Sequence, residues 1–277
     1  MTLNNINGSN VNSFVVSRRC TLNTQRNLMN RGIILTALAS ILLLPIASSG
    51  QEDGGSGFLF YKPKASFGVR FGYAQPSASS DIFNYVRQQF TINTRDFAAA
   101  TVAVDIAIRA TERLDIVANI GTSESSTTSE YRDWVDGFQG YNKPIEQTTT
   151  FLRVPITLNL KLYLRDRGRS VSQFVWVPNR WSPYIGVGGG ATWSKFRQEG
   201  RFVDYQTEDI FSGDLVSQGS GLTANFFSGI DFSIHPKWIL NFEGRYSWAK
   251  TDMSGSYPNY TLDLSGLQGT AGFSILF

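Results

Sequence analysis

The sequence is poor in the residues on which much catalytic and metal chemistry depends. Its 277 residues include one Cys and one His. A single Cys excludes a framework of disulfides, and one Cys with one His excludes a zinc site built from these two ligands. The same scarcity removes most routes to His-dependent catalysis. We therefore expect neither a metal nor a cofactor, and we predict that the protein is not an enzyme.

Charge is also scarce. Charged residues make up 17% of the chain, against about 25% in an ordinary soluble domain, and the formal net charge is +3. The pI of about 9.0 is not accompanied by any run of basic residues, so we expect no nucleic-acid partner. Aromatic residues make up 13% of the chain. Abundant aromatics and a low net charge are atypical of disorder, so the bulk of the chain is predicted to fold.

Only one stretch, residues 33–47, is continuously apolar. As a helix it would rise about 22 Å, which is short of the hydrocarbon core of about 30 Å. Arg31 precedes it and small residues occupy 47–50, which is the order of a secretory signal peptide with cleavage near Ser49 or Gly50. The alternatives are an inner-membrane anchor and a buried core helix. No Cys stands at the cleavage point, so we expect no lipid anchor.

The first 28 residues are polar and rich in Asn, unlike the short basic start of a signal peptide. Met29 stands directly before Asn30 and Arg31, which favours Met29 as the true start of translation. We predict that residues 1–50 are an N-terminal extension and signal peptide and that 51–277 is the mature domain. The single Cys, Cys20, lies in the part that is removed.

After Gly57, apolar and polar residues alternate with a period of two, which is typical of strands with two different faces. In the cleanest segment, 151–164, every second residue from Leu152 to Leu164 is Leu, Ile or Val. The candidate strands are longer than the ~5–6 residues usual in globular proteins and close to the ~9–11 of a membrane-crossing strand. Eight segments share this pattern, namely 65–74, 101–109, 114–122, 151–164, 184–194, 222–234, 238–248 and 267–277.

The connections between these segments alternate in length. Residues 110–113 and 235–237 form short turns. Long loops at one end and tight turns at the other are typical of transmembrane barrels. The connection 165–183 breaks the alternation; we prefer to interpret it as a flap, and the alternative is an extra pair of strands. The long connections are 75–100, 123–150, 195–221 and 249–266.

The polar faces of the segments carry full charges among Gly, Ser and Thr. We therefore predict an all-β fold, an eight-stranded antiparallel up-and-down transmembrane barrel with apolar faces toward lipid and polar faces toward a narrow lumen. An unpaired charge in that lumen would cost several kcal/mol, so we expect the inward charges to pair. The predicted lumen charges are Arg70, Asp105, Arg109, Asp115, Arg153, Lys161, Asp231, Glu243 and Arg245.

Aromatic residues near the ends of the segments fit the two lipid–water interfaces of such a barrel. Trp181 and Trp238 fall at the short-turn end, whereas Trp193, Tyr246 and Trp248 fall at the long-loop end. The alternative is that they are ordinary core aromatics.

The end of the sequence reads Thr270-x-Gly272-x-x-Ile275-x-Phe277. This pattern resembles the C-terminal signal by which the barrel-assembly machinery recognises outer-membrane barrels. With the alternating 152–163 and the Gly-rich 184–191, it makes 58–277 similar to the small outer-membrane β-barrel family of the OmpA/OmpW type. The long 165–183 departs from that family, and we expect no cell-wall-binding domain.

The resemblance implies a Gram-negative outer-membrane location with both termini in the periplasm. It also implies two partners, outer-membrane lipid and the assembly machinery. We expect a monomer with a plugged, salt-bridged lumen and a structural or surface-interaction role; its extracellular partner is not readable from the sequence. The alternative function, which OmpW-type barrels suggest, is a narrow channel or passive transporter for small solutes, including hydrophobic ones. His235, in a predicted turn before Pro236, is a surface residue rather than a base.

Two predicted loops carry apolar side chains. Residues 81–90 are predicted to form a short amphipathic helix with Phe83, Val86 and Phe90 on one side. We expect both loops to pack over the barrel, and the alternative is a binding surface. The aromatic residues of the second loop are Tyr131, Trp134, Phe138 and Tyr141.

Overall fold

The computed structural model describes residues 57–137, 143–258 and 260–277. The chain divides into two units, Met1–Gln51 and Glu52–Phe277, and all described residues belong to the second. The predicted signal peptide, the start at Met29 and the cleavage point lie outside the described residues. None of the helices in the described ranges is long and apolar enough to cross a membrane.

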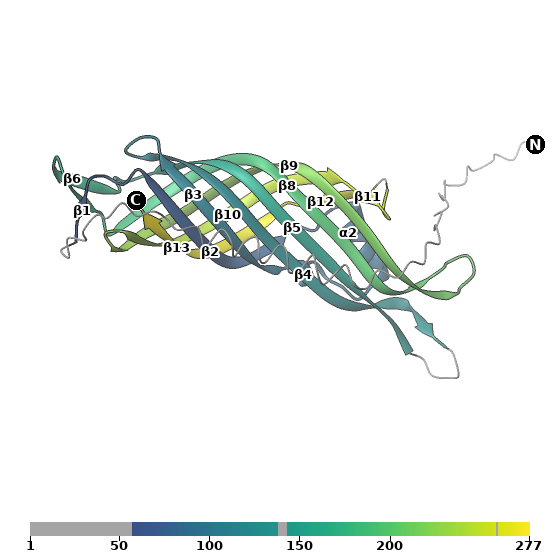
Figure 1. Ribbon diagram of the computed structural model, residues 1–277. Coiled ribbons are helices and arrows are strands. Elements are labelled where there is room, and N and C mark those ends of the chain that lie inside the picture. Colours follow the sequence, from purple (N-terminus) through teal and green to yellow (C-terminus); the bar gives the residue numbers. More distant parts are fainter. Residues whose placement is uncertain (1–56, 138–142, 259) are drawn as a thin grey trace, which may run out of the picture. The chain divides into compact units, whose positions relative to one another are not determined.

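Eight antiparallel strands form the closed wall of a barrel (Figure 1). In chain order they are β2 (Ala65–Pro76), β3 (Ala99–Arg109), β4 (Leu114–Asp136), β5 (Lys143–Tyr163), β8 (Trp181–Val203), β9 (Ile210–His235), β10 (Trp238–Asp252) and β13 (Gly266–Leu276). Each wall strand pairs with the next one in the sequence, and the pairing of β13 with β2 closes the ring. The predicted up-and-down, eight-stranded barrel is confirmed.

The two faces of the wall differ as the alternation predicts. Apolar side chains on the outer face are open to the surroundings, with 61% of Leu158 and 85% of Leu222 exposed. The inner face is buried and largely polar, and it includes Arg70, Asp115 and Glu243. An apolar outside around a polar inside is the arrangement of a membrane-spanning barrel and the reverse of a soluble sandwich.

Four wall strands are much longer than the sequence pattern predicts. β4 has 23 residues, β5 21, β8 23 and β9 26. The prediction of long loops over 123–150 and 195–221 is therefore wrong for most of those residues. The reason is that the outer face is polar, with Thr128 and Thr148 paired at 3.1 Å, while the inner face mixes polar Ser129 with apolar Ile145 and Phe196. Such a mixture gives no regular hydrophobic period.

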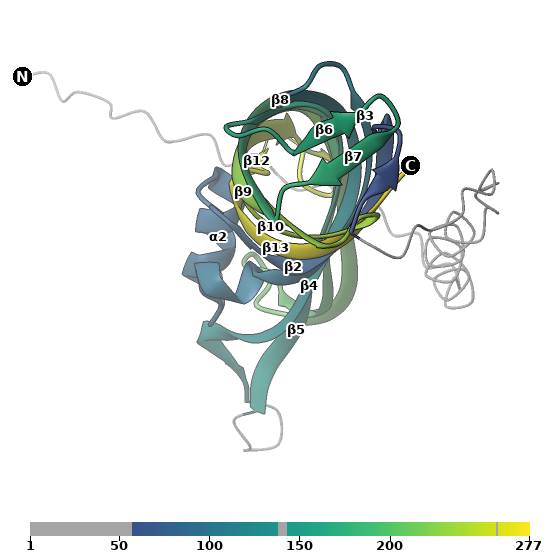
Figure 2. The ribbon, with the colours of Figure 1, turned by 90° about the vertical axis from the view of Figure 1, so that its left-hand side faces the viewer.

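The connection between β5 and β8 contains a strand pair, so the preference for a flap is wrong. β6 (Gly168–Ser172) and β7 (Val175–Pro178) form a hairpin, which is joined by β1 (Leu59–Phe60) in a three-stranded sheet. Trp176 of β7 is buried against Ile239 and Leu276 of the wall. The sheet lies across one mouth of the barrel, which we call the short-turn end (Figure 2).

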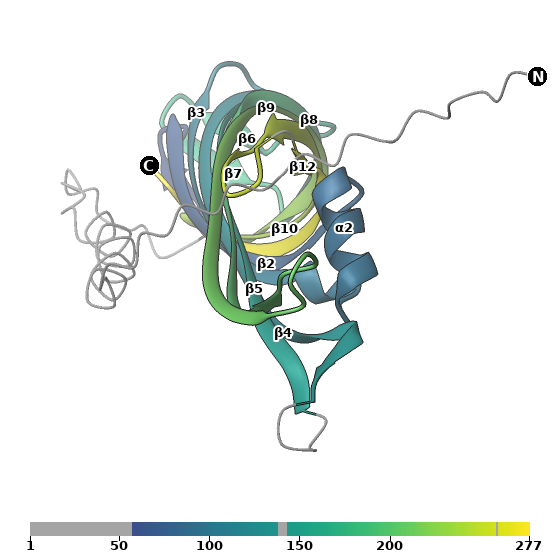
Figure 3. The same cartoon turned by 90° about the vertical axis from the view of Figure 1, so that its right-hand side faces the viewer.

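The other end, which we call the long-hairpin end, carries the remaining elements. These are α2 (Asp81–Gln89), the 3₁₀-helix η1 (Thr94–Phe97), β11 (Ser254–Gly255) and β12 (Thr261–Asp263), and α2 is seen from this end in Figure 3. The predicted amphipathic helix is confirmed, because Phe83 and Val86 are fully buried and Phe90 nearly so.

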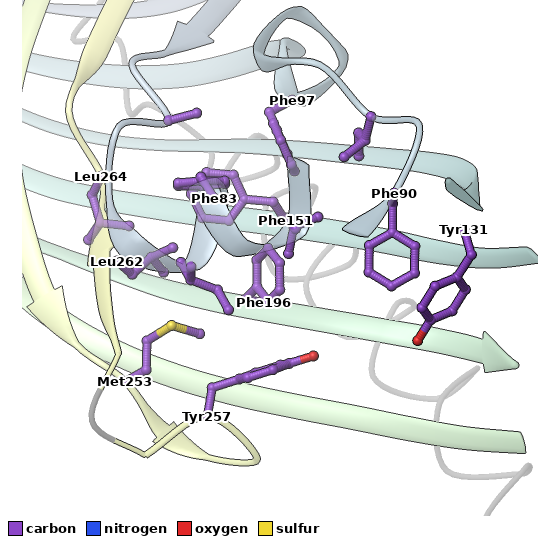
Figure 4. Close-up of a cluster of buried hydrophobic side chains, with 14 of the residues drawn as sticks. Phe83, Phe90, Phe97, Tyr131, Phe151, Phe196, Met253, Tyr257, Leu262 and Leu264 are labelled. Carbon is purple, nitrogen blue, oxygen red and sulfur yellow. The ribbon is translucent and has the colours of Figure 1, made fainter. Parts of the chain in front are cut away.

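A buried apolar cluster, which we call the cap cluster, joins α2 to the inner side of the wall. Its aromatic members meet edge to face, with the ring of Phe83 4.8 Å from that of Phe97 and 5.4 Å from that of Phe151 (Figure 4). The largest members are Ile82, Phe83, Val86, Phe90, Ile92, Phe97, Tyr131, Ile145, Phe151, Phe196, Met253, Tyr257, Leu262 and Leu264.

Candidate functional site

The polar lumen of the barrel is the candidate site, because the wall strands direct all nine predicted lumen charges to its inner face. Arg70, Asp115, Arg153, Asp231, Glu243 and Arg245 are buried, and Asp105, Arg109 and Lys161 are half-buried. Alternation in each strand accounts for this placement, since every one of these residues lies on the face opposite the exposed apolar side chains.

Four of the charges form a compact central cluster. The Arg70 guanidinium pairs with Asp105, at 2.5 Å from Nε to Oδ2, and with Glu243. Glu243 also pairs with Arg245, at 2.9 Å from Nη2 to Oε1. Tyr184 donates its hydroxyl hydrogen to the other Glu243 oxygen at 3.2 Å. One carboxylate thus holds two arginines and a tyrosine, and this central cluster crosses the lumen between β2, β3 and β10.

A second group of charges lies nearer the short-turn end. Lys161 pairs with Asp231 at 2.8 Å, and the Tyr163 hydroxyl donates to the same carboxylate at 2.8 Å. Arg167, just before β6, pairs with Asp115 at 2.6 Å. Sequence reasoning missed Arg167, because it lies in a connection outside any alternating segment. These pairs tie the wall to the chain that crosses the mouth.

Arg109 pairs with Glu112 of the adjacent turn at 3.1 Å. Its guanidinium also lies over the ring of Trp176, 5.8 Å from the centroid. The carboxylate that it faces is largely exposed, so this pair marks the edge of the lumen rather than its interior.

Aromatic side chains fill the space that the charges leave, and glycines make room for them. A Cβ atom at Gly186 would collide with the Phe227 ring, and one at Gly229 would lie 2.5 Å from the Tyr184 hydroxyl. Tyr184 packs edge to face against Phe227, with ring centroids 6.3 Å apart. The Lys161 ammonium lies 3.7 Å from the centroid of the Tyr184 ring. Aromatic rings therefore occupy part of the lumen beside the charges.

Arg153 departs from the expected full pairing. Within the described ranges it forms no ion pair; its Nη1 donates to the Leu264 carbonyl at 3.4 Å and its guanidinium lies 5.5 Å from the centroid of the Phe151 ring. Asp263 is the carboxylate whose charge acts on it. Both Asp263 oxygens already accept hydrogen bonds, from Ser79 at 2.6 Å and from the Ser265 backbone at 2.9 Å.

The cap cluster accounts for the aromatic residues of the second predicted loop. Tyr131 is buried, with its ring 4.4 Å from that of Phe90, and Trp134 packs against the cluster. Their predicted packing is confirmed, whereas Phe138 and Tyr141 lie outside the described residues. Burial raises the pKa of Tyr85 to about 12 and raises the pKa of Tyr131, so both stay neutral at physiological pH.

The five predicted interface aromatics lie on the outer face, but Trp193 stands in the middle of β8 because that strand is longer than predicted. Trp181 and Trp238 begin β8 and β10, and Trp193, Tyr246 and Trp248 lie toward the long-hairpin end. From Trp238 to Trp248 the strand runs about 33 Å. At the usual tilt of about 40° this is a height of about 25 Å, which matches the apolar band of a membrane barrel.

The residues of the predicted assembly signal line the seam where β13 meets β2. Thr270 and Gly272 are buried on the inner face, and Ile275 and Phe277 point outward. The Phe277 carbonyl accepts hydrogen bonds from the backbone of Lys64 and Ala65, both at 2.9 Å. These positions are thus part of the closure of the barrel.

His235 lies exposed at the end of β9, in the short turn that leads to β10. Its Nδ1 accepts a hydrogen bond from the Lys237 backbone at 3.4 Å. In the part of the chain that the structure describes, no three His, Cys, Asp or Glu side chains are grouped so as to hold a metal ion.

Comparison with known proteins finds similarity at the level of structure. No protein-family model and no curated protein sequence matches the chain. OprG from Pseudomonas aeruginosa, an outer membrane protein, is 14% identical, with a TM-score of 0.43 over 79% of this chain and 99% of that one. A major outer membrane protein from Thermus thermophilus is 9% identical, with a TM-score of 0.43 over 78% of this chain and 100% of that one.

Ail, the attachment invasion locus protein of Yersinia pestis, was crystallised with the heparin analogue sucrose octasulfate. It is 11% identical, with a TM-score of 0.35 over 77% of this chain and 99% of that one. The chain is similar in fold to small outer-membrane β-barrel proteins. The barrel itself is defined by the strand pairings of this chain.

Proposed function

We propose that the protein is an integral outer-membrane barrel with a closed lumen, acting as a structural or surface-interaction protein. The observation that carries the proposal is the inverted wall: exposed apolar side chains surround a buried, charged interior. Exposed Ile156, Leu158 and Leu160 follow one another on the outer face of β5. Such a surface is stable only in contact with lipid, and a lumen this narrow can be filled by side chains.

Contacts at both ends and in the middle of the barrel support a closed lumen. The β6–β7 hairpin crosses the short-turn end with Trp176 buried, the central cluster bridges the lumen with ion pairs, and the cap cluster fills the long-hairpin end. Each of these contacts would have to open for a solute to pass.

The proposed orientation places the short-turn end and both termini in the periplasm. Phe277 and the start of β2 are joined by backbone hydrogen bonds at that end. Membrane barrels of this type turn tightly on the periplasmic side and extend their longer connections outward. The β4–β5 and β8–β9 hairpins would then face the exterior and offer a surface to partners. Exposed apolar side chains near their tips include Val135, Tyr205 and Phe211.

Recording in a planar bilayer tests the closed lumen. The refolded chain is added to the bilayer, and faster migration of the unboiled sample on a gel serves as the folding control. We expect no conductance from folded protein. Steady or gated openings from a sample that passes the folding control would contradict the closed lumen and favour a channel.

One observation favours a narrow channel as the second candidate function. A cavity of about 40 Å³ lies on the short-turn side, lined by Asp115, Lys161 and Trp176, and another of about 40 Å³ is lined by Arg153 and Thr192. The ion pairs of the lumen separate these two cavities. If the protein is a channel, Glu243→Ala raises its conductance and Arg153→Ala changes its ion selectivity; if neither variant conducts, this second function is rejected.

An enzymatic role is not part of the proposal. His235 is exposed and lies at the periphery of the barrel, away from the lumen and its charges. We expect His235→Ala to leave folding unchanged and to alter no lipid-modifying activity. Loss of such an activity in the variant would make the protein an enzyme.

A further inference from the structure

One cation of the lumen lacks a direct ion pair within the described part of the chain. Five cations each have a carboxylate partner, in the pairs Arg70–Asp105, Arg109–Glu112, Lys161–Asp231, Arg167–Asp115 and Arg245–Glu243. Arg153 is left over among the described residues, although it is only 9% exposed. A buried guanidinium cannot lose its proton to escape the cost of burial, and the charge of nearby Asp263 acts on Arg153 without a direct ion pair.

The space beside Arg153 is lined by groups that donate hydrogen bonds. The cavity of about 40 Å³ is bordered by Arg153 and by the hydroxyls of Thr101, Ser123, Thr192 and Ser247. Thr101 and Thr192 are engaged, with the Thr122 carbonyl at 3.0 Å and with Thr223 at 2.7 Å. The side chains of Ser123 and Ser247 form no hydrogen bond with the described residues. Two free hydroxyls and one unpaired guanidinium therefore border the same cavity.

We propose that this cavity binds a small monovalent anion, namely chloride. The charge of the ion would complete the pairing of Arg153, and the hydroxyls of Ser123 and Ser247 would donate to it. A cavity of about 40 Å³ has room for about three water molecules, which is enough for one such ion. Phe151 and Leu264, which contact Arg153, belong to the cap cluster (Figure 4), and Leu264 also lines the cavity.

The chloride site requires the folded barrel but does not require a closed lumen. The chloride site and the proposed function can therefore fail independently of each other. The chain is refolded in detergent in sodium chloride or in sodium gluconate at equal ionic strength, because gluconate is a much bulkier anion than chloride. The thermal midpoint is read from the loss of the fast-migrating folded band. Binding to the folded state alone should raise the midpoint in chloride by about 2–4 °C at several times the Kd.

Two variants and one control identify the site. Arg153→Gln should have equal midpoints in the two salts. The double variant Ser123→Ala with Ser247→Ala keeps the Arg153 charge and should reduce the chloride-dependent shift of the midpoint. It keeps the test valid if Arg153→Gln does not fold. Arg197→Gln removes a guanidinium that pairs with Asp214 on the outer face, and it should keep the full shift.

Bromide provides the direct observation. Crystals of the wild-type chain grown in sodium bromide should show an anomalous peak within hydrogen-bonding distance of the Arg153 guanidinium. Equal wild-type midpoints in chloride and gluconate would overturn the proposal. So would a chloride shift that persists in a folded Arg153→Gln variant, or crystals with no bromide beside Arg153.

Discussion

At the scale of single residues, Glu243 carries more of the lumen than any other carboxylate. It pairs with Arg70 and Arg245 and accepts a hydrogen bond from Tyr184. Replacing it leaves two buried guanidinium groups short of a partner. We expect Glu243→Ala to lower the free energy of unfolding by about 3–5 kcal/mol, measured by urea titration in detergent.

Glu199 supplies the matched control for that experiment. It pairs with Arg197 on the outer face at 2.8 Å, and its side chain is 61% exposed. We expect Glu199→Ala to change the free energy of unfolding by less than about 1 kcal/mol, because water screens an exposed pair. Similar losses for the two variants would show that the central cluster contributes no more than a surface pair.

Gly186 tests whether the lumen is packed. The Phe227 ring occupies the space that a side chain at this position would need. We expect Gly186→Val to destabilise the barrel by about 1–3 kcal/mol through overpacking, and the added change Phe227→Ala to recover part of that loss. Gly244→Ala is the control, since no atom lies within 4 Å of its added Cβ. Equal stability of the Gly186 and Gly244 variants would indicate an open lumen.

The inward position of Arg70, Glu243 and their neighbours was predictable from the alternation, because successive residues of a strand face opposite sides of the sheet. The pairing partners were not predictable in the same way. Arg167 reaches Asp115 from a connection, and Arg153 remains unpaired because Ser79 and Ser265 hold Asp263. Both depend on contacts between segments far apart in the chain, which a local pattern does not contain.

At the scale of elements, Trp176 is the buried apolar anchor of the β6–β7 hairpin. Trp176 packs on Ile239 and Leu276, whereas Arg169 of β6 is exposed. We expect Trp176→Ser to free the hairpin and to speed trypsin cleavage after Arg169 about tenfold. Val171→Ala, at an exposed position of the same hairpin, should leave the cleavage rate unchanged. If both variants are cleaved at the wild-type rate, Trp176 does not anchor the hairpin.

Helix α2 gives the cap a defined response to high pH. Burial raises the pKa of Tyr85 from 10.0 to about 12, so the folded cap favours the neutral phenol. Its stabilising contribution is full below pH 10.0 and is lost as the pH rises through about 12. We expect the free energy of unfolding to fall over this range, and Tyr85→Phe to reduce that fall. An unchanged pH profile in the variant would exclude Tyr85 as a source.

The same elements show where periodicity stops being informative. The segment of β5 from Leu152 to Tyr163 was predictable because lipid-facing Leu and Ile alternate with polar residues. Its continuation toward Lys143 was not, since Thr148 and Thr150 outside alternate with Gln147 and Thr149 inside. The strand persists there because it pairs with β4 and β8 on its two sides. Strand pairing, which the hydrophobic pattern does not report, sets the length.

At the scale of the whole molecule, all the described contacts that close the ring lie within 57–277. We therefore expect a chain of residues 51–277 to refold in detergent without the N-terminal segment, to migrate faster before boiling than after it, and to sediment as a monomer. A requirement for residues 1–50 in refolding would contradict this, and a stable dimer would contradict the expected monomer.

The long strands have a mechanical consequence. β8 and β9 run from the wall into their projecting hairpin with continuous pairing, from Trp181 opposite Phe232 to Val203 opposite Ile210. A force that pulls a hairpin tip away from the membrane therefore acts along the strands and loads their hydrogen bonds with the neighbouring wall strands in shear, many at once. Such loading resists rupture better than peeling bonds one by one. The β8–β9 hairpin is thus a stiff lever, and tension at its tip is transmitted directly to the barrel wall.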